Sequence, residues 1–171
     1  MKGMINMAKK ILLLSASPRK GGNSDLLCDQ FIRGAGEAGN QVEKIFLRDR
    51  KINYCTGCGA CRKNGGKCVQ KDDMAEVLDK MIAADVIVMA TPVYFYTMNA
   101  QMKTLIDRTC ARYSEIRNKD FYFIVAAADT RKRAMEHPGG VQGVHVLSEP
   151  GKREGCCLWH RSLEEGRYQE E

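Results

Sequence analysis

The sequence predicts one α/β domain, in which a parallel sheet is covered by helices on both faces. Apolar runs alternate with segments of helical periodicity from Lys9 to Asp129. The run "VIVMA" is continuous and rich in β-branched residues, which is typical of a strand buried on both faces of a parallel sheet. A chain of 171 residues with 44% hydrophobic residues is long enough for one sizeable core.

Each element has its own pattern. Strands are short apolar runs, helices have apolar residues three and four positions apart, and Gly, Pro and Asn mark the turns between them. Asp72 and Asp73 are suited to cap the helix that follows them. The expected elements are a strand at 9–17, a turn at 18–24, a helix from Ser24 to about 36, a strand at 41–47, a cysteine loop, a helix at 72–85, a strand at 86–90, a loop at 91–98, a helix at 99–113 and a strand at 120–128.

The ends of the chain do not follow this pattern. Residues 1–8 are expected to be a disordered start, and residues 130–171 have no steady period where another helix and strand are expected. One codon choice for "CCLWHRSLEEGRYQ", read one base later, encodes "VVYGTGAWKKGDI", an apolar strand followed by a glycine turn. We therefore interpret 130–171 as an aberrant tail, with a frameshift near Glu136 favoured over a divergent tail.

Charge and hydropathy restrict the class of partner. The net charge is +6, but the basic residues are scattered and are not interleaved with aromatic residues, so no nucleic-acid partner is expected. No apolar run approaches the roughly 18 residues of a membrane helix, and the opening "MKGMINMAKK" is too polar for a secretory signal. The expected location is cytoplasmic, without membrane association.

The first loop, "SASPRKGGNS", has the composition of an anion site. Backbone N–H groups and hydroxyls at the start of a helix are unpaired donors, and the helix dipole favours negative charge there. Gly21 and Gly22 allow the backbone to approach a ligand closely. An ordinary capped turn is the alternative to a phosphate site. The candidate phosphate-binding residues are Ser15, Ser17, Pro18, Arg19, Asn23 and Ser24.

Two further segments, together with this loop, resemble a known family over residues 9–129. The loop "SASPRKGGNS" and the segment "TPVYFYTMNAQMKTLIDR" resemble flavodoxin-like NAD(P)H-dependent FMN reductases, and "CTGCGACRKNGGKC" is similar to the cysteine motif of the iron–sulfur flavoproteins, a branch of that family. The resemblance implies a flavodoxin-like three-layer sandwich that binds FMN, with its last strand and helix missing or replaced here. It also implies a homodimer or homotetramer.

The resemblance places the second segment beside the flavin ring. An aromatic cluster at the carboxyl end of a buried strand favours a flat ligand, although core aromatics are the alternative. "AAADT" (126–130) is expected to form a third wall by its position alone. The residues expected here are Thr91, Pro92, Val93, Tyr94, Phe95, Tyr96, Ala127 and Asp129. Asn99, Lys103 and Asp107 are interpreted as members of surface helix pairs.

Four cysteines occupy the loop at 55–68: Cys55, Cys58, Cys61 and Cys68. In a reducing compartment such a loop favours metal or redox chemistry over a structural disulfide. The spacing favours a [4Fe–4S] cluster, while free thiols and zinc stay open; Val69 stands where ferredoxins have proline. Cys28 and Cys110 are expected to be core residues of amphipathic helices.

The expected function is an FMN-dependent oxidoreductase. The resemblance implies NAD(P)H or a reduced ferredoxin as electron donor, and a free flavin, a quinone or a similar small molecule as acceptor. Because the cofactor performs the chemistry in such enzymes, we nominate no side-chain acid or base. The alternatives are a non-catalytic electron carrier of the flavodoxin type and a thiol or zinc redox sensor.

Overall fold

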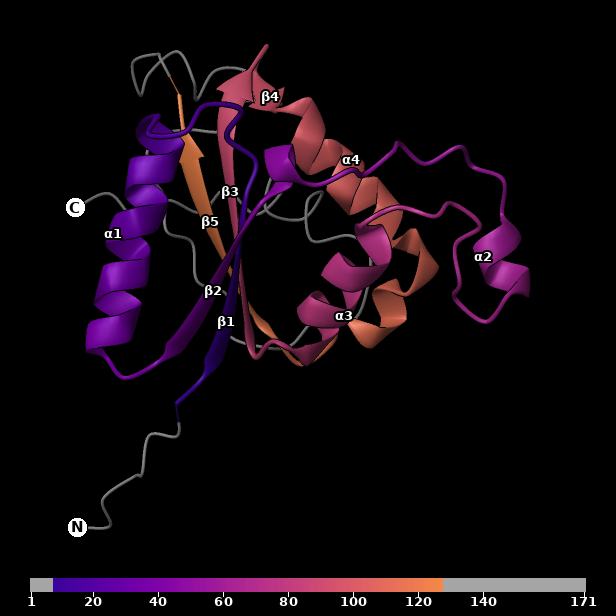
Figure 1. Ribbon diagram of the computed structural model, residues 1–171, viewed down its shortest axis with the longest axis horizontal. Helices are drawn as coiled ribbons and strands as arrows, with labels where there is room; N and C mark the ends of the chain where they lie inside the picture. Colours follow the sequence, from indigo (N-terminus) through magenta and orange to yellow (C-terminus); the bar gives the residue numbers. More distant parts are fainter. Residues whose placement is uncertain (1–7, 128–171) are drawn as a thin grey trace, which may run out of the picture.

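A parallel sheet forms the centre of the domain in the computed structural model, which describes residues 8–127 (Figure 1). Its strands run in the order β2-β1-β3-β5, and a short β4 pairs antiparallel with the end of β3. This confirms the predicted α/β class. The strands are β1 (Lys10–Ser15), β2 (Gln41–Phe46), β3 (Val86–Tyr94), β4 (Thr97–Met98) and β5 (Asp120–Ala126).

Helices cover both faces of this sheet, as expected. Helix α1 (Asn23–Glu37) lies on one face, and α3 (Met74–Ala83) and α4 (Ala100–Arg108) lie on the other (Figure 1). Alternation along β1 produces two cores, because Leu12 and Leu14 pack in the cluster that includes α3 and α4 residues, whereas Ile11 and Leu13 pack with residues of α1. Strand β1 from Ile11 onward and the first six residues of β3 are therefore buried on both faces.

Two predicted boundaries are wrong. The segment 91–98, expected to be a loop, continues β3 to Tyr94 and returns as β4, because pairing with β5 extends as far as Pro92. Helix 99–113 ends at Arg108 and is followed by two 3-10 turns, η2 (Thr109–Ala111) and η3 (Tyr113–Glu115). The structure also contains η1 (Leu47–Asp49) and a short helix in the cysteine loop, α2 (Ala60–Lys63).

The parallel arrangement of the strands determines which edge of the sheet can bind a ligand. The carboxyl ends of β1, β3 and β5 lie at one edge of the sheet, where open α/β sheets bind their ligands. Between Ala8 and Ala127 no helix is both long enough and apolar enough to cross a membrane. The expectations for the first seven residues and for 128–171, including the frameshift, lie outside the described residues.

Candidate functional site at the carboxyl edge of the sheet

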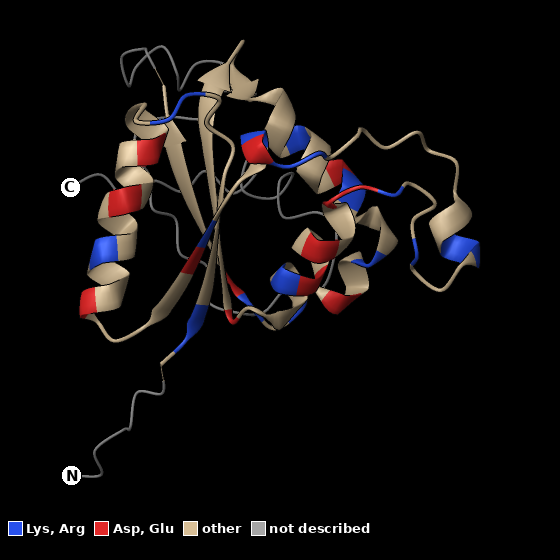
Figure 2. Cartoon of the chain, in the orientation of Figure 1, with Lys and Arg blue, Asp and Glu red and all other residues tan. Residues whose placement is uncertain are grey.

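The loop after β1 is a tight turn stabilised by its own polar groups. Ser17 Oγ donates a hydrogen bond to the Arg19 carbonyl (2.8 Å) and accepts one from the Arg19 amide (3.3 Å). Gly21 has a φ of +70°, a conformation that other residues rarely adopt. Arg19 itself is exposed, and Figure 2 shows a basic stretch in this loop above the start of α1. The turn thus presents a guanidinium beside a helix terminus.

The amino end of α1 is open to an anion. Gly22 occupies the N-cap position, and no side chain caps the helix. Without such a cap, the first amides of a helix are free to donate to a ligand, and the helix dipole favours negative charge at this end. Asn23 is exposed at this terminus, while Ser24 is buried in the first turn. Pro18 is partly exposed at the start of the turn.

A buried ion pair supports the loop from below, and the sequence did not indicate it. Asp25 accepts a hydrogen bond from the Gly21 amide (2.7 Å) and one from Lys44 Nζ on β2 (2.5 Å). Burial by itself raises the pKa of Asp25, but the hydrogen bonds from Lys44 and Gly21 outweigh it and hold the pKa below its ordinary value. Lys44 also reaches Asp29 (2.7 Å). The pair fixes the turn relative to the sheet.

Asn99 joins the first loop to the end of β3. Its Nδ2 donates to the Ala16 carbonyl (2.5 Å), its backbone amide donates to Thr91 Oγ1 (3.1 Å), and its Oδ1 caps α4 by accepting from the Met102 amide (3.2 Å). Asn99 is only 1% exposed, so the interpretation of it as a surface residue is wrong. Its position before a helical pattern indicates the cap, but no spacing indicates the contact with Ala16.

The hairpin between β3 and β4 presents three aromatic side chains to solvent. Tyr94 is 43% exposed, Phe95 97% and Tyr96 56%, so they are not core aromatics. Phe95 and Tyr96 have positive φ angles of 48° and 65°, in the left-handed region that a bulky residue seldom adopts. Thr91 is buried at the base of the hairpin, whereas Pro92 and Val93 are partly exposed. The hairpin offers flat apolar surface beside the loop after β1.

Three predicted site residues remain, Ser15, Ala127 and Asp129, and the structure describes the first two. Ala127 directly follows Ala126, which pairs with Pro92 across β3 and β5. Ser15 is fully buried at the end of β1, next to Cys28 of α1, so its hydroxyl lies beneath the loop surface. Burial raises the pKa of Cys28 to about 11, which agrees with its expected place in the core. Asp129 lies outside the described residues.

The cysteine loop projects from the body of the domain between η1 and α3 (Figure 1). Cys55, Cys58 and Cys68 are exposed, and Cys61 is partly exposed at α2. Among the described residues, no three His, Cys, Asp or Glu side chains are arranged closely enough to hold a metal ion. Hydrogen bonds from the Ala60 amide and the Thr56 hydroxyl lower the pKa of Cys58. The loop is therefore accessible and contains a thiol that is disposed to ionise.

A fifth cysteine lies beside this loop. Cys110 is exposed in η2, and not in a helix core as the sequence suggested. Partial burial of its thiol and the neighbouring thiols of Cys55 and Cys61 raise its pKa to about 12. Its helical periodicity was misleading because α4 ends two residues earlier. The expected surface pair of Lys103 and Asp107 is present on α4.

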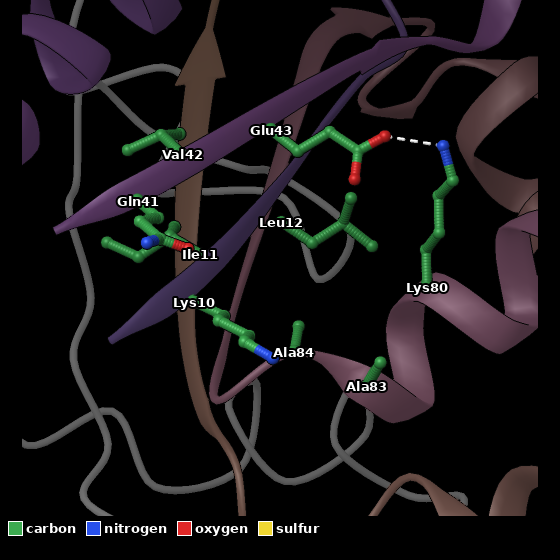
Figure 3. A pocket seen from close by; sticks show the side chains of 9 residues that line it. All are labelled: Lys10, Ile11, Leu12, Gln41, Val42, Glu43, Lys80, Ala83 and Ala84. Carbon is green, nitrogen blue, oxygen red and sulfur yellow. Dashed lines mark hydrogen bonds and ion pairs between the residues drawn. The ribbon is translucent and has the colours of Figure 1, made fainter. Parts of the chain in front are cut away.

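A hollow of about 250 Å³ lies at the opposite end of the sheet (Figure 3). It is lined at the starts of β1 and β2 and at the end of α3, and the ion pair between Glu43 and Lys80 (2.5 Å) spans it. It is open, and no loop after the carboxyl end of a parallel strand contributes to it. It is therefore separate from the site at the carboxyl edge.

The side chains and amides of the two loops fit a phosphorylated flat ring and an iron–sulfur cluster to different degrees. At the carboxyl edge, the uncapped start of α1, Arg19 and the aromatic hairpin fit a phosphate attached to a flat ring. In the cysteine loop, four thiols within fourteen residues are the ligand type that an iron–sulfur cluster needs. In their described positions, however, no three of the loop's thiols lie close enough together to hold a metal ion. A cluster would require the loop to draw its thiols together.

The comparisons with known sequences agree with this geometry. Residues 9–138 match the family described as "NADPH-dependent FMN reductase". An iron-sulfur flavoprotein of Archaeoglobus fulgidus is 40% identical over 142 residues, which is 82% of this chain and 69% of that protein. Another from the same organism is 43% identical over 58% of this chain and 44% of its own length. One from Methanosarcina thermophila is 39% identical over 66% of this chain and 56% of its own length.

Solved structures show the same fold. A quinone reductase from Klebsiella pneumoniae superposes with a TM-score of 0.63 at 22% identity, covering 74% of this chain and 62% of that one. An azoreductase from Bacillus anthracis superposes with a TM-score of 0.61 at 19% identity, covering 72% and 71%. The fold is therefore flavodoxin-like. The chain spans about half the length of the first curated relatives that it matches.

Proposed function

Because the chain belongs to the NADPH-dependent FMN reductase family, we propose that it is an FMN-dependent oxidoreductase. Electrons pass from NAD(P)H or a reduced ferredoxin to the bound flavin, and from there to a free flavin, a quinone or a similar acceptor. The family also suggests a homodimer or homotetramer. The observation that supports this most strongly is the joining of three segments at one edge, where Asn99 holds the loop after β1 to the end of β3, beside the end of β5.

The phosphate end of FMN is assigned to the loop after β1. The amides at the start of α1 donate to it, Arg19 forms charge-assisted hydrogen bonds with it, and Ser17 shapes the turn. Asp25 is paired with Lys44, so its carboxylate does not leave an unbalanced negative charge beside the phosphate. The loop therefore binds by backbone and side-chain donors together.

The ring of FMN is assigned to the hairpin of Thr91 to Tyr96, with Ala127 and Asp129 as the third wall. Left-handed backbone at a bulky residue costs on the order of 1–3 kcal/mol and persists where the surrounding structure enforces it, frequently at functional sites. Phe95 and Tyr96 both have such backbone and both expose their rings. Bound there, FMN supplies hydride acceptance at ring atom N5. The protein supplies the orientation.

The cysteine loop is assigned to a [4Fe–4S] cluster that exchanges single electrons between the flavin and a partner. The relatives named as iron-sulfur flavoproteins support this assignment, as do the four thiols of Cys55, Cys58, Cys61 and Cys68. A thiol redox sensor is the second candidate. The observation in its favour is the proximity of the Cys110 thiol to those of Cys55 and Cys61.

Absorption spectra of the full chain, purified without oxygen, test these functions. Twin flavin bands that NAD(P)H bleaches support the reductase, and a broad shoulder with bound iron and sulfide supports the cluster. A folded protein that stays colourless and binds no added FMN contradicts the flavin assignment. Flavin without iron, together with reversible oxidation of Cys110 and a loop cysteine, favours the sensor.

Arg19→Ala tests the phosphate assignment, with Lys20→Ala as a matched control in the same exposed loop. Loss of a charge-assisted hydrogen bond of about 1.5–3 kcal/mol weakens FMN binding by roughly tenfold or more. We expect Lys20→Ala to change the dissociation constant much less. Both are measured by titration of FMN-free protein, following flavin fluorescence. Equal effects of the two variants would contradict the role of Arg19.

A further inference from the structure

Arg108 is a buried charge at the end of a helix whose other buried residues are apolar. It is the last residue of α4, and its side chain is 2% exposed. Its guanidinium contacts both oxygens of Asp72 with N–O distances of 2.6 and 2.9 Å, and the Asp72 side chain is fully buried. A buried ion pair is weak evidence for stability, since apolar residues of the same volume often serve as well. Its position therefore needs another reason.

The pair lies between the two ends of the cysteine loop. Arg108 Nη1 donates to the Asn53 carbonyl (2.7 Å), which precedes the first cysteine. Asp72, which follows the last cysteine, accepts from the Asn53 amide (3.0 Å). Two further hydrogen bonds join these two ends of the loop, which we call its neck. One runs from the Lys51 amide to Asp73 (2.7 Å) and the other from Gln70 Nε2 to the Tyr54 carbonyl (3.0 Å). Arg108 of α4 thus contacts both chain segments of the neck.

The same guanidinium reaches a cysteine. Arg108 Nη2 lies 3.6 Å from Cys68 Sγ, within hydrogen-bonding range for sulfur, while it also contacts Asp72. The planar fork of arginine can serve three acceptors in fixed directions, which a lysine ammonium cannot reproduce. Cys68 is therefore the loop cysteine whose sulfur is held by a group of the domain core.

We propose that Arg108 is a positioning residue for the cysteine loop, which closes the neck of the loop and donates an N–H to the sulfur of Cys68. The proposal rests on the proposed function where it treats Cys68 as a cluster ligand. Hydrogen bonds to ligating sulfurs tune the reduction potential of a cluster, and they raise it by stabilising the extra electron. Arg108 would then determine both where Cys68 stands and how readily its cluster is reduced.

Helix α4 connects the neck of the cysteine loop to the proposed FMN site. It is capped by Asn99 at the edge assigned to FMN, and it ends at Arg108 in the neck of the cysteine loop. Nine helical residues span about 13 Å at 1.5 Å per residue. The two proposed redox sites are therefore attached to opposite ends of one short, rigid element.

The test uses Arg108→Lys, which keeps the charge but not the fork, and the exposed Arg117→Lys as its matched control. In cluster-free full chain, backbone amide exchange is measured across 50–74 by mass spectrometry. We expect exchange in the neck to accelerate about tenfold in Arg108→Lys and to stay unchanged in Arg117→Lys. Flavin binding and circular dichroism establish that both variants fold.

The second measurement follows anaerobic reconstitution with iron and sulfide. We expect Arg108→Lys to give a more negative midpoint potential in a titration monitored by electron paramagnetic resonance, while Arg117→Lys keeps the wild-type value. Wild-type exchange and wild-type potential in Arg108→Lys would overturn the proposal and leave the cluster function standing. Failure of the wild-type chain to take up iron and sulfide would overturn the ligand role of Cys68 together with the proposed cluster.

Discussion

Gly66 is one of the residues at which the cysteine loop contacts the body of the domain. Its φ is +82°, and a Cβ placed there would lie 3.0 Å from Arg112 Cγ and 3.1 Å from the Ala111 carbonyl oxygen in η2. The neighbouring Gly65 also has a positive φ, of +58°, but a Cβ there meets nothing within 4 Å. The two glycines therefore differ in contact rather than in the sign of φ.

We predict that Gly66→Ala destabilises the domain more than Gly65→Ala. Left-handed backbone penalises both alanines by about 1 kcal/mol, and the contact with η2 adds about 1–3 kcal/mol for Gly66 alone. Urea unfolding of the two variants measures the difference. Equal free energies of unfolding would mean that the loop does not pack against η2 in solution.

Cys58 and Cys110 show how unlike the thiols of this region are. Local N–H and hydroxyl donors lower the pKa of Cys58, whereas partial burial and two neighbouring thiols raise that of Cys110. The thiolate is the form that binds metal and reacts with oxidants. Cys58 is thus the more readily ionised of the two thiols.

At the scale of elements, α4 depends on Asn99 for two separate purposes. Its Oδ1 caps the helix, and its Nδ2 ties the helix to Ala16, 83 residues away in sequence. A buried donor or acceptor that loses its partner costs about 1–3 kcal/mol, and the loss of a helix cap costs about 1 kcal/mol.

We predict that Asn99→Ala lowers the free energy of unfolding by about 2–4 kcal/mol and weakens FMN binding. Asn99→Ser keeps a capping oxygen but is too short to reach Ala16, so it should recover only the smaller, capping part. Urea unfolding and FMN titration of both variants separate the two purposes. Full recovery by serine would show that the contact with Ala16 contributes nothing.

At the scale of the whole molecule, two buried carboxylates link stability to pH. Burial alone raises the pKa of Asp25 and of Asp72, but Lys44 and Gly21 in the first case, and Arg108 with two backbone amides in the second, hold both below 3.8. A carboxylate with a lowered folded pKa stabilises the protein fully above its unfolded pKa of about 3.9. That contribution is lost as pH falls through the folded value.

We predict that the free energy of unfolding falls steeply below about pH 4 as these two groups become protonated. The Asp25→Asn variant should be less stable than the wild type at pH 6 and should lose less on acidification. Urea unfolding at pH 6, 5, 4 and 3 measures both effects. The same slope in the variant and the wild type would show that the pair with Lys44 does not carry the pH dependence.

The sequence alone was sufficient for the four parallel strands and most helices, because burial imposes a period on residues that are close in the chain. The runs at β1 and β3 and the apolar faces of α1 and α3 were identified in this way. The hairpin of β3 and β4 was missed because Pro92 and Tyr94 look like a turn until the pairing of β3 with β5 is known. Pairing with β5 therefore outweighed the local turn preference of these residues.

The candidate site was predictable to a similar extent. Parallel strands bring their carboxyl ends to one edge, so the three segments of the proposed flavin site could be placed together from their order alone. Asn99, Asp25 and Arg108 could not be given their roles, because each depends on a partner from a different segment. The signal available in the sequence was only that they are polar residues near helix ends.

The sequence by itself determined the α/β class, the order of the elements and the donor chemistry of both loops, since these follow from residue type and from periodicity along the chain. Only the tertiary structure decided which of those donors are enclosed, which are exposed and which meet. Arg108 reaches Asn53 across 55 residues, and Cys110 lies beside Cys55 and Cys61, which precede it by 55 and 49 residues. Such contacts depend on how the elements pack, and packing has no local period in the sequence.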